Sequence, residues 1–142
     1  MFGEKKENLS WKLWKELTTT IENLEKSHTK RISHLKLTNP QFNVLATLKF
    51  GGSMPLRSIS KRLNVTGANI TCVMDNLEKR NFAERIPSKN DRRIINAGLT
   101  DEGEKMFEEI TPHYLESINQ ETSKLTDDEK IKLMELLSKL KN

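Results

Sequence analysis

The stretch spanning residues 56–99 constrains the fold of this chain most, because the spacing of its apolar residues changes within it. The first part shows the three- and four-residue spacing of two amphipathic helices, with a break at residues 64–65 between them. Two short runs rich in branched and aromatic residues follow, at 82–86 and 94–99, as expected of strands. The stretch therefore predicts a helix, a turn, a second helix and a two-stranded hairpin, an arrangement known as a winged helix-turn-helix.

The second predicted helix carries recognisable signals at both of its ends. Thr66 occupies the N-cap position, where its hydroxyl oxygen is placed to accept a hydrogen bond from the backbone N–H of Ala68 or Asn69. Asn81 follows Lys79 and Arg80 at the end of the helical pattern, and asparagine tolerates the left-handed conformation that stops a helix. The stripe expected to face the core consists of four apolar residues, Ile70, Val73, Met74 and Leu77.

The opposite face of this helix is small and polar over its first turns. Gly67 and Ala68 permit close approach to a phosphate or a base edge, and asparagine and threonine side chains hydrogen-bond to base edges in the major groove of DNA. An ordinary solvated helix face has the same composition, so the helix alone does not decide between the two interpretations.

Charge favours the interpretation as a nucleic-acid surface. Residues 56–99 hold nine Lys and Arg and four Asp and Glu, whereas the rest of the chain holds 15 basic and 16 acidic residues. The segment between the two predicted strands, 87–93, is turn-forming and basic. A basic excess on a predicted helix-turn-helix is the electrostatic footprint expected of a protein that binds a phosphate backbone.

Two other classes of function fit these residues less well. A winged-helix module that binds other proteins gives no evident role to Arg92 and Arg93 beside Asp91, whereas arginines at a hairpin tip have a ready role in the minor groove. An enzyme is disfavoured, because the sequence shows no glycine-rich phosphate loop, no nucleophile and base at recognisable spacing, and no cluster of metal ligands. We therefore expect neither a cofactor nor a metal ion.

Four short motifs mark the same stretch: TGANIT at 66–71, DNLEKR at 75–80, DRR at 91–93 and LTDEG at 99–103. Together they resemble the core signature of the MarR family of bacterial transcription regulators, and the resemblance extends over almost the whole chain. One departure is Asn81, where the family usually has glycine. The resemblance implies a sequence-specific DNA-binding transcriptional regulator, a homodimeric repressor of a pseudo-palindromic operator, with release by a small ligand as a further expectation.

In the MarR family the second helix of the motif lies in the major groove, and an arginine of the wing enters the minor groove. The resemblance therefore implies DNA contacts from nine residues of this chain: Thr66, Gly67, Ala68, Asn69, Ile70, Thr71, Lys89, Arg92 and Arg93. Asp91 is expected to orient one of the two wing arginines through a charge-assisted hydrogen bond.

Amphipathic helices are predicted on both sides of this motif. Apolar residues spaced by three and four indicate one long helix over 10–36, and further helices begin after Thr100 and Thr126, each a candidate N-cap. Pro112 is expected to kink the first of these. The alternative to a dimer is a monomer that buries these stripes on itself, and the resemblance favours the dimer, because MarR proteins dimerise through their first and last helices. The expected layout is a mainly α-helical single domain, 1–142, with a winged helix-turn-helix lobe at 38–99 and dimerisation helices at about 8–36 and 100–142.

Three aromatic residues, Trp14, His28 and Phe42, are candidates for lining a small-ligand pocket, although such residues at helical spacing more often belong to a plain core. Cys72, expected on the outward face of the second helix, gives a further alternative, a redox-responsive regulator in which oxidation places a polar or bulky group at the DNA surface. No stretch approaches the roughly 18 apolar residues of a membrane span, and the charged residues 4–7 do not fit a signal peptide. We therefore expect a cytoplasmic protein without a membrane partner.

Overall fold

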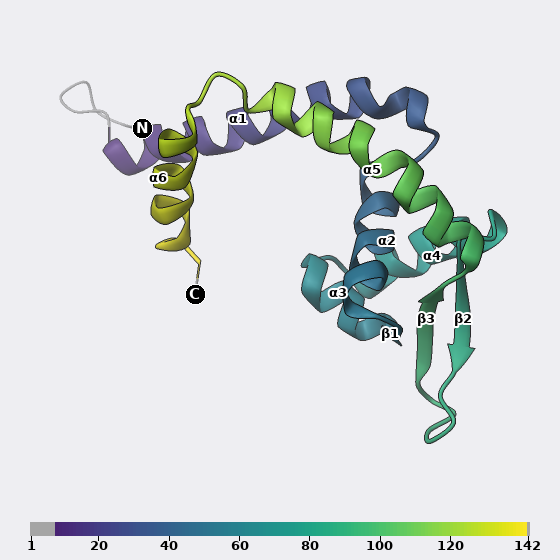
Figure 1. Cartoon of the computed structure of the whole chain (residues 1–142). Coiled ribbons are helices and arrows are strands. Elements are labelled where there is room, and N and C mark those ends of the chain that lie inside the picture. Colours follow the sequence, from purple (N-terminus) through teal and green to yellow (C-terminus); the bar gives the residue numbers. More distant parts are fainter. Residues whose placement is uncertain (1–7, 142) are drawn as a thin grey trace. The chain divides into compact units, whose positions relative to one another are not determined.

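The computed structural model describes residues 8–141 of the chain (Figure 1). Residues 4–7, which bear on the predicted absence of a signal peptide, lie outside this range. The described residues form, in chain order, α1 (Leu9–Ile32), a 3-10 turn (Ser33–Leu35), α2 (Asn39–Gly51), β1 (Met54–Pro55), α3 (Leu56–Leu63), α4 (Gly67–Lys79), β2 (Ala83–Pro87), β3 (Ile95–Leu99), α5 (Asp101–Glu121) and α6 (Asp127–Ser138). The predicted fold class, mainly α with a small hairpin wing, is confirmed.

These elements divide into two compact units. One unit joins the residues up to Arg31 with the residues from Leu115 onward, and the other is continuous, Ile32–Tyr114. The continuous unit contains the predicted lobe 38–99 together with the first part of α5, so the lobe is larger than its helix-turn-helix and hairpin.

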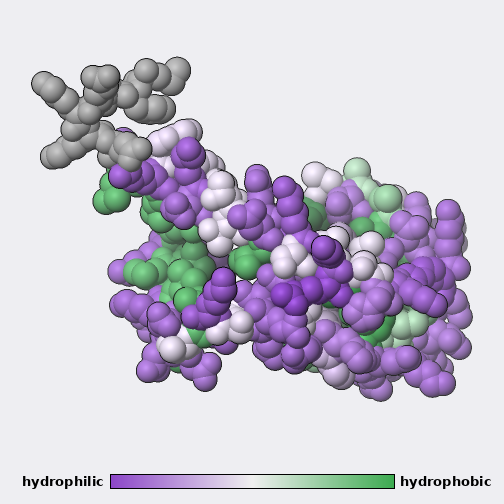
Figure 2. Space-filling model, turned by 90° about the horizontal axis from the view of Figure 1, so that it is seen from above, coloured by the Kyte–Doolittle hydropathy of each residue, from purple (hydrophilic) through white to green (hydrophobic). Residues whose placement is uncertain are grey.

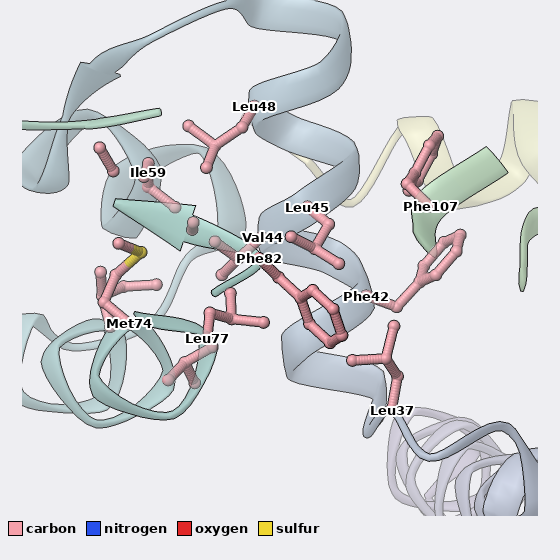
Figure 3. Packing of buried hydrophobic residues seen from close by; sticks show 14 of the residues in the cluster. Leu37, Phe42, Val44, Leu45, Leu48, Ile59, Met74, Leu77, Phe82 and Phe107 are labelled. Atoms are coloured by element: carbon pink, nitrogen blue, oxygen red, sulfur yellow. The ribbon is translucent and has the colours of Figure 1, made fainter. Parts of the chain in front are cut away.

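Helix α2 lies at the centre of the unit Ile32–Tyr114. Figure 3 shows α2 between Met74 and Leu77 of α4 on one side and Phe107 of α5 on the other. The four residues that were predicted to face the core from α4 are the buried residues of that helix. Because α4 packs on α2 through this stripe, its opposite face is presented on a fixed support.

Local signals at the helix ends act as predicted. The hydroxyl of Thr66 accepts a hydrogen bond from the backbone N–H of Asn69 at 3.1 Å, and Asn69 is thus the donor of the two alternatives considered. Thr38 begins α2 with a complete capping box. Asn81 takes the left-handed conformation, with φ of 61°, and Asn64, at the break between α3 and α4, does the same with φ of 53°.

Within the described residues, three short strands form an antiparallel sheet in the order β1-β3-β2. Met54 of β1 lies opposite Ala97 of β3, and Arg85 of β2 lies opposite the same residue on its other side. The short link before α3 therefore pairs with the hairpin and extends it to a three-stranded sheet.

The two hairpin strands begin one residue later than predicted, at Ala83 and Ile95. The preceding residues belong to turns instead. The N–H of Phe82 donates to the carbonyl of Leu77 at 2.9 Å and closes the end of α4, and the N–H of Ile94 closes the turn of the wing. At Phe82 and Ile94 the backbone N–H thus bonds within a turn instead of pairing with the neighbouring strand.

The first long helix ends earlier than predicted, at Ile32 rather than at Lys36. A 3-10 turn follows, and Lys36 adopts a left-handed conformation with φ of 62°. Arg80, at the end of α4, donates a hydrogen bond to the carbonyl of Lys36. The change of direction lets Leu37, which is 5% exposed, enter the core.

The other unit exposes an extensive apolar surface on α1, α6 and the last turns of α5. Trp14 is 63% exposed and Met134 is 61% exposed. Figure 2 shows apolar side chains gathered at the end of the molecule where α1 begins. The exposed apolar residues are Leu9, Trp11, Leu13, Trp14, Ile21, Leu24, Leu115, Ile118, Ile131, Leu133, Met134, Leu136 and Leu140. Apolar surface of this extent is typical of a site that another protein covers.

Polar contacts tie α1 to the last part of α5 within this unit. The carboxylate of Glu121 accepts from the hydroxyl of Ser27 at 2.6 Å and from Nε of Arg31 at 2.7 Å, and these bonds lower the pKa of Glu121. Helix α5 runs without interruption across Pro112. No helix within residues 8–141 is both long and apolar enough to span a membrane.

Candidate nucleic-acid interface

The first turn of α4 is exposed and held by local hydrogen bonds. Thr66 caps the N–H of Asn69, and the hydroxyl of Thr71 donates to the carbonyl of Gly67 at 3.0 Å. A Cβ built at Gly67 meets no atom within 4 Å, so the helix end is open to an approaching ligand. The positive end of the helix dipole at such a position favours an anion such as a phosphate. Five of the six contact residues predicted on α4 are exposed, namely Thr66, Gly67, Ala68, Asn69 and Thr71.

Ile70 is the exception among the predicted contact residues. Its side chain is 1% exposed and belongs to the same buried stripe as Met74. The prediction of a direct contact at Ile70 is therefore wrong, because a ligand cannot reach this side chain while α4 is packed. Its role is to fix the helix on which Asn69 and Thr71 are presented.

The wing, residues 88–94 between β2 and β3, exposes its basic side chains. Lys89 and Arg92 are exposed, and the side chain of Arg93 is 91% exposed. Oδ1 of Asp91 accepts from the backbone N–H of Arg93 at 3.0 Å and from its Nε at 3.3 Å. This is the contact expected of Asp91, with Arg93 as its partner. The guanidinium is thus tethered at Nε, while most of the side chain faces solvent.

Arg85 of β2, counted above among the basic residues of the stretch 56–99, is bound to α4. Its guanidinium donates to Oδ1 of Asp75 at 2.7 Å and to Oε2 of Glu78 at 3.1 Å. The hydrogen bond to Asp75 is the largest cause that raises the pKa of Arg85. This contact escaped the sequence reasoning, although Asp75 and Glu78 stand one helical turn apart, a spacing at which one cation reaches both. Fewer basic side chains are therefore available to contact DNA than the nine counted in residues 56–99.

The three predicted pocket residues belong to different units. Trp14 is exposed on α1, and Nδ1 of His28 lies 2.8 Å from the hydroxyl of Ser117 in the same unit. Phe42 is 7% exposed in the core of the other unit, where its ring stacks on Tyr114 with centroids 3.6 Å apart. Phe42 therefore has a packing role, and a pocket formed by the three residues stays a prediction.

Thiol chemistry and metal binding each make their own requirements of the described residues. Cys72 is exposed on α4, on the outward face as predicted. Over residues 8–141, no group of three or more His, Cys, Asp or Glu side chains is placed to hold a metal ion. The exposed features of the unit Ile32–Tyr114 are those of a binding surface.

A helix-turn-helix whose second helix exposes a small polar first turn, followed by a hairpin tipped with arginines, defines the winged-helix class of DNA-binding proteins. The MarR family model matches residues 37–95. The transcriptional repressor MdtR of Bacillus subtilis is 35% identical over 104 residues, which are 73% of this chain and 67% of the relative. The multiple antibiotic resistance protein MarR of Salmonella typhimurium is 32% identical over 110 residues, 77% of this chain and 76% of the relative. The chain belongs to the MarR family.

A solved structure agrees over nearly the whole chain. The crystal structure of a mutant MarR from E. coli in complex with operator DNA matches with a TM-score of 0.84 and 25% identity, over 92% of this chain and 94% of that one. The chain is therefore a DNA-binding transcriptional regulator and not an enzyme. The family predicted from the sequence motifs is confirmed.

Proposed function

We propose that this regulator is a sequence-specific homodimeric repressor that binds a pseudo-palindromic operator through α4 and the wing. One observation carries the proposal. The first turn of α4 and the tip of the wing are both exposed, and both belong to the compact unit Ile32–Tyr114. One compact unit thus presents both a helix end and an arginine-tipped hairpin.

The chemistry of the exposed groups suits different parts of a duplex. Asn69 and Thr71 are side chains that hydrogen-bond to base edges in the major groove, and Gly67 lets the backbone of α4 come close to a phosphate. Arg93 is the group that suits a narrow minor groove, where the negative potential of DNA is strongest. Helix contacts would read sequence, and the wing would add affinity and shape recognition.

The dimer is supported by the apolar side chains that α1 and α6 expose. A two-fold dimer presents two copies of α4, and half-sites about 34 Å apart, one turn of DNA, are the spacing typical of dimeric helix-turn-helix proteins. A pseudo-palindromic operator follows from that symmetry. Met134→Glu, at a side chain that is 61% exposed, should shift the protein to monomers in sedimentation, whereas Lys132→Glu, on the polar side of the same helix, should not.

Two further parts of the proposal concern the effector and the location of the protein. Release by a small effector is supported by the family resemblance. Phe42, one of the three candidate pocket residues, adds no support because its side chain is buried in the core. A cytoplasmic location is supported by DNA as the partner. The redox alternative through Cys72 keeps one supporting observation, the exposure of that side chain on α4.

The test is fluorescence anisotropy of the purified protein on DNA from upstream of its own coding region, against a scrambled duplex, at several salt concentrations. We expect tight binding that prefers the native duplex and weakens steeply with salt, because phosphate contacts release counterions. A folded dimer that binds neither duplex at any salt concentration would exclude the proposal and favour a winged-helix module that binds proteins.

A further inference from the structure

Arg85 connects the two parts of the proposed interface. It lies on β2, the strand that leads into the wing, opposite Ala97 of β3. Its guanidinium reaches α4, where it donates to Asp75 at 2.7 Å and to Glu78 at 3.1 Å. A third, longer contact of 3.5 Å to the carbonyl of Thr71 brings it to the turn that carries the proposed base contacts.

The contact of Arg85 with Asp75 and Glu78 restricts the orientation of β2 relative to α4 as well as the distance between them. The side chain of Arg85 is 24% exposed, against 54% for Asp75 and 44% for Glu78, so the arginine is the most enclosed member of the group. A guanidinium is planar and carries several donors in fixed directions. When it binds two carboxylates on one helix, it orients the strand relative to that helix instead of only attracting it.

The other contacts of the hairpin lie near its base, where Ala83 of β2 and Ala97 of β3 are buried in the core. The sheet beyond the hairpin is small, because β1 adds only the pairs Met54 with Ala97 and Pro55 with Asn96. Farther out, most residues of the hairpin between 86 and 95 are exposed, and two strands without packing partners are only marginally stable. Arg93 at the wing tip and the first turn of α4 must nevertheless engage adjacent grooves of one duplex at the same time. Their relative placement therefore needs an additional constraint.

We propose that Arg85 is a positioning residue that holds the wing at the angle to α4 at which Arg93 and the helix engage one DNA site together. The inference rests on the proposed function. The competing explanation is that Arg85 only neutralises Asp75 and Glu78, whose charges would otherwise repel phosphates. Ion pairs at the protein surface contribute little to folding, so the variants below are expected to fold.

The first test measures the wing without DNA. Cys72 is the only cysteine of the chain and is exposed on α4, so Lys89→Cys on the wing gives one pair of spin labels within each chain. In full-length protein diluted with unlabelled protein, pulsed EPR should give a narrow distance distribution that broadens with Arg85→Ala. Lys49→Ala, which removes two ion pairs between α2 and α5, is the matched control and should leave the distribution narrow. An unchanged distribution in Arg85→Ala overturns the proposal.

The second test is a double-mutant cycle on DNA affinity. Arg93→Ala should weaken binding about tenfold in the parent protein. In the Arg85→Ala background the same change should weaken it less than about threefold, because the wing is no longer held in place. In the Lys49→Ala background the full loss should remain. Equal losses in all three backgrounds overturn the proposal.

Two further variants separate positioning from charge. Arg85→Ala combined with Asp75→Asn and Glu78→Gln removes the repulsive carboxylates, and the broad distance distribution and the weak dependence on Arg93 should persist. If this triple variant regains the narrow distance distribution and the full dependence on Arg93, charge neutralisation is the only role of Arg85 and the proposal is overturned. Arg85→Lys, which keeps the charge without the planar fork, should recover only part of each signal. A parent protein that binds no DNA contradicts the proposed function, and the EPR comparison still decides the geometry.

Discussion

Gly103, in the first turn of α5, lies so close to the carbonyl group of Phe82 that a Cβ at this position would be 1.8 Å from the carbonyl oxygen. The same oxygen accepts from the N–H of Thr100 at 3.2 Å, and the hydroxyl of Thr100 caps the N–H of Gly103 at 3.0 Å. Close packing of α5 against the end of the α4 to β2 connection thus explains the glycine of the LTDEG motif.

Gly103→Ala should therefore destabilise the protein by about 3 kcal/mol, because backbone atoms rather than a flexible side chain must move. Urea unfolding at a fixed protein concentration measures the effect. Gly67→Ala is the control, since a Cβ there meets nothing within 4 Å, and its effect should stay within about 1 kcal/mol. A Gly103→Ala protein as stable as the parent would contradict this account of the packing.

Removal of the exposed wing arginine should affect DNA binding and leave folding intact. Arg93→Ala loses only an exposed ion pair with Asp91, so its melting temperature should match that of the parent. Its DNA affinity should fall about tenfold, and the slope of log affinity against log salt should decrease by about one. Lys105→Ala, which removes an exposed lysine of α5, should change neither quantity. Equal affinities of parent and Arg93→Ala would exclude the wing from the interface.

Neighbouring positions on α4 should separate recognition from stability. Asn69→Ala and Thr71→Ala should relax the preference at one base position by about 1 to 3 kcal/mol without unfolding the protein. Ile70→Ala should instead cost about 2 to 5 kcal/mol of folding stability, because it leaves a cavity in the core. Selection of binding sites from random duplexes measures the first effect, and denaturant unfolding the second. An Ile70→Ala protein with parental stability but altered base preference would reverse this assignment.

Signals that act within one helical turn were predictable from the sequence. The cap at Thr66, the left-handed Asn81 and the buried stripe of α4 each depend on residues a few positions apart, and all three are present. Ile70 belongs both to the TGANIT motif and to that stripe, and its side chain packs in the core with the stripe. Its burial shows that a place in a motif does not by itself make a contact residue.

Contacts between elements were not predictable in the same way. Arg85 and Asp75 stand ten residues apart on a strand and a helix, and their contact depends on how β2 packs against α4. The early end of α1 involves Lys36 and Arg80, 44 residues apart. A local pattern carries no information on either pairing, because each is fixed by the packing of whole elements.

The junction of α1 and α5 should make stability depend on pH through Glu121. Hydrogen bonds from Ser27 and Arg31 lower the pKa of Glu121 below its ordinary value of 4.5. The ionised carboxylate therefore contributes stability above about pH 4.5, and this contribution is lost as the pH falls through the lowered pKa. Glu121→Gln should lose less stability than the parent on acidification, as measured by thermal unfolding, whereas Glu25→Gln, exposed on α1, should follow the parent. Identical acid profiles for Glu121→Gln and the parent would exclude this linkage.

Cys72 offers a direct probe of which face of α4 meets DNA. Because the thiol is exposed on the outward face, a bulky group attached to Sγ should prevent the helix from entering a groove. Alkylation should therefore abolish DNA binding of the parent, whereas Cys72→Ser should bind normally and ignore the reagent. Peroxide then tests the redox alternative on the same two proteins, since oxidation converts the thiol to a polar acid. A loss of affinity in the parent alone would support redox control through Cys72, and the same loss in Cys72→Ser would remove it.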